Sequence, residues 1–318
     1  MSLLAVGSIA LDSVETPFGR REEVLGGSAT YFSTSASFFG PVRLVATVGE
    51  DFPEAHVRFL ASRGVDLAGL ERRPGRTFRW KGRYEFDLNT AHTLDTQLNV
   101  FADFRPELPQ AYRDSEYVFL GNIDPDLQRQ VLDQVRAPRF VACDTMNFWI
   151  TSKRDALLRT LQRVDMLLVN DAEARQLAGE HNVVKAARRI LSCGPRAVVV
   201  KRGEYGALLF SGDHVFAASA YPLAALFDPT GAGDSFAGGF MGYLARARRH
   251  DLAVMRRAIV LGSVLASFAV EQFSLERLKT LTHEEIRARF AEFRQLTHFD
   301  ELELDLFVPG LTSSPRRD

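Results

Sequence analysis

One short segment combines a carboxylate with residues that leave the backbone open to a ligand, Asp228-Pro229-Thr230-Gly231-Ala232-Gly233-Asp234. Thr230 suits the start of a helix, and Gly231-Ala232-Gly233 puts almost no side chain between the main chain and a ligand. N–H groups at a helix start bind anions such as phosphate, and the helix dipole is expected to keep Asp234 ionised at neutral pH. Asp234 could then accept a proton from an attacking hydroxyl, although an ordinary capped helix explains these residues equally well.

The rest of the chain predicts the elements that must position this segment. Short apolar runs rich in β-branched residues predict buried strands at 3–6, 42–48, 117–120, 140–142, 166–169, 197–200 and 207–210. Apolar residues at helical spacing predict helices at 52–63, 125–135, 153–163, 172–177, 184–191, from Asp234 to about 248, 252–270 and 284–295. Alternating strands and helices predict an α/β fold with a mostly parallel central sheet flanked by helices.

Two segments break this alternation. Residues 12–24 and 76–101 alternate apolar and polar side chains, the period of half-exposed strands. They predict a small β-sheet lid made from two separate pieces, with two long surface loops as the alternative. The expected organisation is a core of residues 1–11, 25–75 and 102–308, the lid, and a flexible tail of residues 309–318.

The composition limits the functions open to this chain. Lys and Arg number 39 and Asp and Glu 40, which argues against a nucleic-acid partner. The two cysteines, Cys143 and Cys193, form no Cys-x-x-Cys pair and indicate no thiolate metal site. We identify no signal sequence and no apolar run of membrane-spanning length, so we expect a cytoplasmic protein without a membrane partner.

Four motifs in order carry a family resemblance. Residues 228–236 resemble the C-terminal signature of the PfkB (ribokinase-like) carbohydrate kinase family. Gly26-Gly27, followed by a helix of small residues and then by Gly40 and Val48-Gly49-Glu50-Asp51, resembles its N-terminal signature. Asn170-Asp171-Ala172-Glu173 is similar to the family's Asn-x-x-Glu, and Lys201–Ala207 to its Gly-x-x-Gly hairpin. The resemblance implies a ribokinase-like core with a β lid, MgATP as the donor and an alcohol as the acceptor.

The resemblance also assigns roles on the donor side. Asp234 would be the catalytic base, and Gly231, Ala232 and Gly233 would form the anion hole. The remaining donor-side candidates are Asn170 and Glu173 for Mg²⁺ and phosphate, Lys201, Gly203 and Gly206 for the nucleotide, and Asp228 for a monovalent cation such as K⁺. Asn170 and Glu173 could equally form a helix capping box. Phe268 and Phe273 could line the adenine site or pack in the core.

The acceptor side departs from ribokinase. The resemblance implies that Asp12 binds acceptor hydroxyls and that Gly26 and Gly27 let the acceptor lie against the backbone. Ser28 and Tyr31 are the remaining candidates for binding the acceptor. They stand where ribokinase has Lys and Asn, which puts ribose in doubt. We therefore expect a sugar or polyol, with a nucleoside kinase or a non-catalytic ligand-binding regulator as alternatives.

Three further expectations concern the lid and one loop. The aromatic residues Trp80, Tyr84 and Phe86 could stack a base or merely pack the lid. A homodimer through the lid is a further expectation from the resemblance. After another predicted strand, Asn147 could reach the phosphates or stabilise its own loop.

Overall fold

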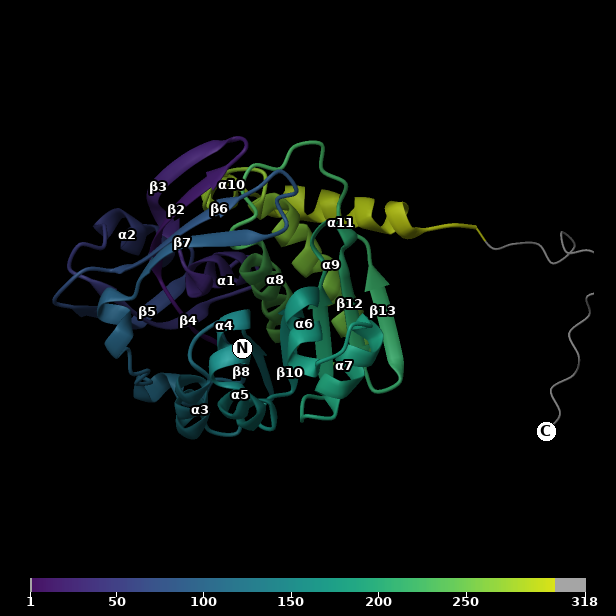
Figure 1. The fold of residues 1–318 in the computed structure, drawn as a ribbon, viewed down its shortest axis with the longest axis horizontal. Coiled ribbons are helices and arrows are strands. Elements are labelled where there is room, and N and C mark those ends of the chain that lie inside the picture. The colour runs from purple at the N-terminus through teal and green to yellow at the C-terminus, as the bar shows by residue number, and fades with distance from the viewer. Residues whose placement is uncertain (1, 301–318) are drawn as a thin grey trace, which may run out of the picture.

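The computed structural model describes residues 2–300, and its strands form two sheets (Figure 1). The main sheet has nine strands in the order β13-β12-β11-β10-β9-β8-β1-β4-β5. Their bounds are β1 Leu3–Val6, β4 Val42–Gly49, β5 Val65–Arg73, β8 Tyr117–Leu120, β9 Phe140–Asp144, β10 Met166–Asn170, β11 Ala197–Lys201, β12 Ala207–Ser211 and β13 His214–Ala218. Seven neighbouring strands, from β5 to β11, are parallel, and β12 and β13 are antiparallel. The mostly parallel sheet that the sequence predicts is confirmed.

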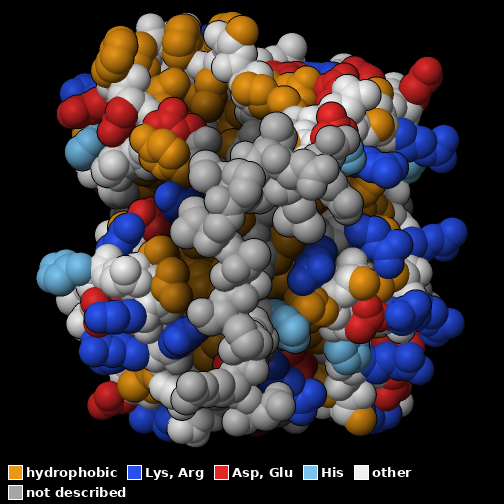
Figure 2. Space-filling model, turned by 90° about the vertical axis from the view of Figure 1, so that its right-hand side faces the viewer, with side chains coloured by type: hydrophobic (Ala, Val, Ile, Leu, Met, Phe, Trp, Pro, Cys, Tyr) orange, Lys and Arg blue, Asp and Glu red, His pale blue; other side chains and the backbone are white. Residues whose placement is uncertain are grey.

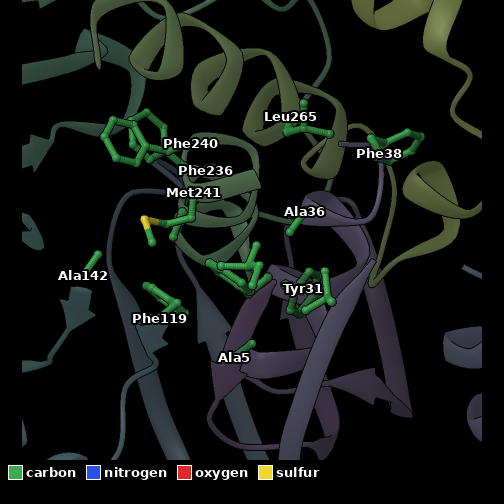
Figure 3. Close-up of a cluster of buried hydrophobic side chains, with 14 of the residues drawn as sticks. Ala5, Tyr31, Ala36, Phe38, Phe119, Ala142, Phe236, Phe240, Met241 and Leu265 are labelled. Atoms are coloured by element: carbon green, nitrogen blue, oxygen red, sulfur yellow. The ribbon is translucent and has the colours of Figure 1, made fainter. Parts of the chain in front are cut away.

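Helices cover both faces of this sheet. They are α1 Ser28–Ala36, α2 Glu54–Ser62, α3 Pro125–Gln134, α4 Asn147–Ser152, α5 Arg154–Leu161, α6 Asp171–Ala178, α7 Val183–Leu191, α8 Ala232–Ala247, α9 Leu252–Ala269, α10 Glu276–Thr280 and α11 His283–Thr297. Alternate residues of β1 show why both faces need cover. Leu3 and Ala5 enter one buried cluster, with α1, α8 and α9, whereas Leu4 and Val6 enter another, with α3, α5 and α7 (Figure 3 shows part of the first).

Four elements were not predicted from the sequence. The strands β5 and β13 form the two edges of the main sheet, and most of their residues are half-buried or exposed. The helices α4 and α10 span 6 and 5 residues. Polar residues interrupt β5, β13 has only five residues, and such short helices lack a full period of apolar residues, so these elements leave no clear pattern.

The second sheet has four strands in the order β3-β2-β6-β7, and we call it the small sheet. Its bounds are β2 Ala10–Thr16, β3 Gly19–Gly26, β6 Phe78–Tyr84 and β7 Ala91–Gln97. β2 pairs in parallel with β6 and places Asp12 opposite Trp80, so the two distant segments do form one sheet. The small sheet stands apart from the main sheet in Figure 1. β2 begins two residues before the expected segment 12–24, and β3 ends two residues after it.

One expectation about the chain's apolar segments is wrong. Within residues 2–300, α9 is long and apolar enough to cross a membrane by length and composition, and 67% of it is buried. It packs on α8 and supplies much of the core, so burial accounts for its composition. On the visible part of the face around α11, apolar and charged side chains are intermixed (Figure 2).

Candidate active site

The carboxyl ends of three parallel strands bring the predicted donor-side residues together. β9 ends at Asp144, β10 at Asn170 and β11 at Lys201. The start of α8 lies against them, because a Cβ added to Gly233 would be 2.9 Å from Lys201 Nζ. The crevice beyond the carboxyl ends of parallel strands is where open α/β sheets bind ligands. Segments far apart in sequence therefore meet at one site.

Residues 228–233, which we call the phosphate loop, lead into α8. Gly231 has φ 74°, the left-handed region that favours glycine, and α8 has no side-chain N-cap. A Cβ on Gly231 would lie 2.4 Å from the ring of Tyr31, so the turn leaves no room for a side chain. The Ala232 N–H donates to Pro229 O at 3.2 Å, so the predicted anion hole must rely mainly on the amides that flank Ala232.

Asp234 lies half-buried in the first turn of α8. Burial raises the pKa of its carboxyl to about 7, the charge of Asp144 adds to the rise, and Lys201 opposes it. Burial and the like charge of Asp144 therefore oppose the ionisation of Asp234 that the helix dipole was expected to favour. A pKa near the working pH is nonetheless what an efficient general base needs.

Asp144 is the important residue that the sequence reasoning missed. Lys201 Nζ donates to Asp144 Oδ2 at 2.9 Å, and both side chains are largely buried. Burial disfavours the charged lysine, but the charges of Asp144 and Glu173 outweigh it and raise the pKa of Lys201. A carboxylate that directly ends a buried strand, as Asp144 does, was the available signal. Asn147, the residue considered instead, begins α4 and accepts from the Phe148 N–H at 2.9 Å.

Asn170 and Glu173 form a capping box, one of the two roles that the sequence allowed for them. The Glu173 N–H donates to Asn170 Oδ1 at 2.7 Å, and the Asn170 N–H donates to Glu173 Oε2 at 2.8 Å. Burial raises the pKa of the Glu173 carboxyl to about 7, with a further rise from Asp144 and a counteracting effect from Lys201. The box starts α6 and fixes Glu173 beside the Lys201–Asp144 pair.

The acceptor-side residues lie where the small sheet joins the main sheet. Asp12 is 5% exposed, and a Cβ on Gly26 would lie only 1.9 Å from Asp12 Oδ2. Burial raises the pKa of Asp12 to about 7; a hydrogen bond from the Gly27 backbone opposes the rise, and Asp228 and Asp234 add to it. Asp12 therefore shares one electrostatic environment with the phosphate loop.

Ser28 and Tyr31 support the site from behind. The Ser28 and Ser8 N–H groups each donate to the other's hydroxyl, at 3.2 and 3.3 Å, which fixes the turn after β1 to the start of α1. Tyr31 is buried under Gly231 and belongs to the large core cluster (Figure 3). Neither side chain lies open to an acceptor, so the structure argues against the expectation that Ser28 and Tyr31 bind the acceptor directly.

The small sheet holds an indole flat against its own backbone. Trp80 lies over Gly82, where a Cβ would be 2.1 Å from Cη2 and 2.3 Å from Cζ2. Trp80 Nε1 donates to Thr93 Oγ1 on β7 at 3.1 Å. Trp80 stands opposite Asp12 in the sheet register, so a flat aromatic surface adjoins the buried carboxylate.

The glycines of the predicted nucleotide hairpin sit at its turn. Gly203 begins the 3₁₀ turn Gly203–Tyr205 and Gly206 follows it, with φ 53° and 83°. A Cβ on Gly203 would lie 2.6 Å from Asn89 Oδ1, in the turn between β6 and β7. The small sheet therefore reaches the donor side as well as the acceptor side.

Phe268 and Phe273 are packed rather than open to a nucleotide. Phe268 is 2% exposed, with the guanidinium groups of Arg277 and Arg289 over its ring at 4.8 and 3.5 Å from the centroid. Phe273 is 7% exposed and packs with Val14 and Tyr84 of the small sheet. Core packing, the alternative for both residues, describes what the structure shows.

Comparison with known proteins identifies the class of this protein. Residues 11–280 match the model of the pfkB family of carbohydrate kinases, and the chain belongs to that family. A cytidine kinase of Thermococcus kodakarensis is 31% identical over 78% of this chain and 90% of that protein. A 2-dehydro-3-deoxygluconokinase of Thermoproteus tenax is 29% identical over 82% of this chain and 89% of that protein.

Solved structures confirm the ribokinase-like fold. A nucleoside kinase of Methanocaldococcus jannaschii, an archaeal member of the ribokinase family, has a TM-score of 0.73 at 19% identity. The match covers 92% of this chain and 98% of that one. The family match and the kinases among the relatives make the chain an ATP-dependent kinase.

The donor side fits a magnesium ion that arrives with the nucleotide. Asp144, Glu173 and Asp234 supply carboxylate oxygen atoms, the type of ligand that Mg²⁺ takes. The same three carboxylates stabilise the positive charge of Lys201. Among residues 2–300, no three acidic, histidine or cysteine side chains are grouped to hold a metal by themselves. Phosphate oxygens and water would have to complete the coordination, as is usual for Mg²⁺.

Proposed function

We propose that Asp234 is the catalytic base of a phosphoryl transfer from MgATP to an alcohol. The acceptor oxygen bonds to the γ-phosphorus, its proton passes to a carboxylate oxygen of Asp234, and the bond to the β-phosphate oxygen breaks to release ADP. Amides around Gly231 and Gly233 stabilise the charge on the transferring group. Bound Mg²⁺ supplies further neutralisation of phosphate charge.

One observation carries this proposal. Asp234 lies at an open helix start, and its pKa of about 7 reflects burial and the nearby charges of Asp144 and Lys201. A base and an anion-binding helix start thus occupy the same turn. Asn170 and Glu173 are proposed to hold the Mg²⁺–phosphate array, and Lys201, Gly203 and Gly206 to border the nucleotide.

We further propose that the acceptor is a sugar-bearing compound with a flat ring, that is, a nucleoside. Asp12 suits adjacent sugar hydroxyls because a carboxylate can accept from both. Trp80 lies flat beside it on Gly82, an arrangement suited to stacking a base. The cytidine kinase similarity supports the same choice, whereas the gluconokinase similarity supports the sugar or polyol first expected.

Two proposals remain for the surroundings of the site. Asp228 is 1% exposed and accepts N–H bonds from Thr230 at 2.9 Å and Ser274 at 3.0 Å. A buried carboxylate held by two amides in this way suits a neighbouring monovalent cation, which activity in K⁺ against choline buffer would test. The small sheet has an exposed edge strand, β7, and a 95% exposed Phe86, which supports a homodimer testable by light scattering.

The function is tested by an ADP-release screen with MgATP across sugars, polyols and nucleosides. We expect release that depends on a nucleoside, with the phosphorylated product detected by mass spectrometry. Release only with a free sugar or polyol would overturn the proposed acceptor but keep the kinase. Tight nucleoside binding without ADP release from any alcohol would instead support a non-catalytic regulator.

A further inference from the structure

Two strands of the small sheet are hydrogen-bonded directly to the phosphate loop or to Phe227, the residue before it. Thr16 Oγ1, on β2, donates to the carbonyl oxygen of Phe227 at 2.9 Å. Thr230 Oγ1 donates to the hydroxyl oxygen of Tyr84, on β6, at 3.3 Å. The ring of Phe18 adds a contact with Phe227, with centroids 5.5 Å apart. The small sheet is thus hydrogen-bonded to this segment at two positions three residues apart, Phe227 and Thr230.

Tyr84 holds the residue that leads into the anion hole. Its side chain is 8% exposed and packs with Val14 and Phe273. Thr230 is fixed from two sides, because its N–H also donates to Asp228 Oδ1 at 2.9 Å. Gly231 follows at once in the left-handed conformation that starts α8. The Tyr84 hydroxyl therefore acts on the backbone of Gly231 through Thr230.

Both contacts come from paired strands of one sheet. β2 and β6 are neighbours in one hydrogen-bonded sheet, from Ala10 opposite Phe78 to Glu15 opposite Arg83. A movement of that sheet away from the acceptor would remove both the Thr16 and the Tyr84 hydrogen bonds. The phosphate loop would then lose its support whenever the acceptor is uncovered.

We propose that Tyr84 is a positioning residue that couples closure of the small sheet over the acceptor to the final geometry of the anion hole. This inference rests on the proposed function. Closure of a mobile element that completes a catalytic site favours the intended acceptor over water. Tyr84 touches the phosphate loop and none of the atoms that react.

The test is the variant Tyr84→Phe, which keeps the ring and removes the hydroxyl. We expect kcat for acceptor phosphorylation to fall about 3- to 10-fold, the loss typical of one hydrogen bond. ADP release without acceptor should stay unchanged, because the sheet is then open in both proteins. A merely structural role would lower both rates. Ser13→Ala is the matched control, since it removes a hydroxyl that accepts from the Glu23 N–H elsewhere in the small sheet.

A double-mutant cycle with Thr230→Val adds a second readout. The two substitutions break the same contact, so the double variant should be no slower than the slower single variant. Thr16→Val removes the other hydrogen bond and should act in the same direction, which keeps the test open where Tyr84→Phe unfolds. Wild-type kcat in Tyr84→Phe, or additive effects in the cycle, would overturn the role of Tyr84. Absence of transfer by the wild type would instead overturn the proposed function.

Discussion

The donor and acceptor sides of the site are built in different ways. The donor side consists of short contiguous segments at strand ends and one helix start, held by local contacts such as the Asn170–Glu173 capping box. The acceptor side is assembled from strands of a separate sheet, in which Asp12 meets Trp80 across 68 positions of sequence. The donor-side motifs therefore owe most of their geometry to short segments, whereas the acceptor side depends on where a whole sheet lies.

The difference should appear in what substitutions do. Changes on the donor side are expected to lower turnover with any acceptor, because the phosphate loop serves every transfer. Changes on the acceptor side are expected to alter the KM of one acceptor class. The predictions below test that division, beginning with the largest effect.

Gly231→Ala should be the most damaging of the glycine changes. Its Cβ would lie 2.4 Å from the Tyr31 ring at φ 74°, so the anion hole must move. We expect kcat to fall about 10²-fold, the loss typical of one misplaced oxyanion donor. Gly233→Ala is the comparison, because its Cβ would meet one side chain, that of Lys201, at 2.9 Å from Nζ. Equal activity of the two variants in steady-state kinetics would contradict this account of the loop.

Trp80→Ala should separate nucleosides from free sugars. Loss of a stacking surface costs about 1–3 kcal/mol of binding free energy per base. The KM for a nucleoside should rise accordingly, with the KM for ATP unchanged. Phe86→Ala is the control, because that ring is 95% exposed in the same sheet. An unchanged nucleoside KM in Trp80→Ala would remove the argument for a flat acceptor.

Asp12→Asn should stabilise the fold at alkaline pH. The folded chain keeps a proton on Asp12 up to about pH 7, whereas the unfolded chain releases it near pH 4. Stability from this group is therefore lost as pH rises between those values. Removing the charge should raise the free energy of unfolding by up to about 4 kcal/mol at pH 8 and by less at pH 5. Urea unfolding at both pH values measures this, and a less stable variant at pH 8 would contradict it.

The contrast between the two sides also explains what the sequence could and could not predict. The phosphate loop and the Asn170–Glu173 pair are contiguous, so their residue types define their geometry. Alternating side chains predicted the small sheet, but not that β2 would pair in parallel with β6. Such pairings join segments through tertiary packing, and no local pattern records them.

The same limit applies to single residues. Asp144 ends a buried strand, yet its partner Lys201 lies 57 positions later. The Tyr84–Thr230 contact spans 146 positions. The pKa of Asp234 depends on burial and on Asp144, neither of which the helix start reveals. Local sequence therefore predicted the donor-side motifs better than the electrostatic environment around them.

The central claim, that Asp234 is the base, is tested most directly by Asp234→Asn. The substitution keeps the shape of the side chain and removes the proton acceptor. We predict that kcat with the preferred acceptor falls about 10²–10⁴-fold. The dissociation constant for MgATP, measured by titration calorimetry on the same sample, should stay close to that of the wild type. Undiminished turnover in Asp234→Asn would contradict the account.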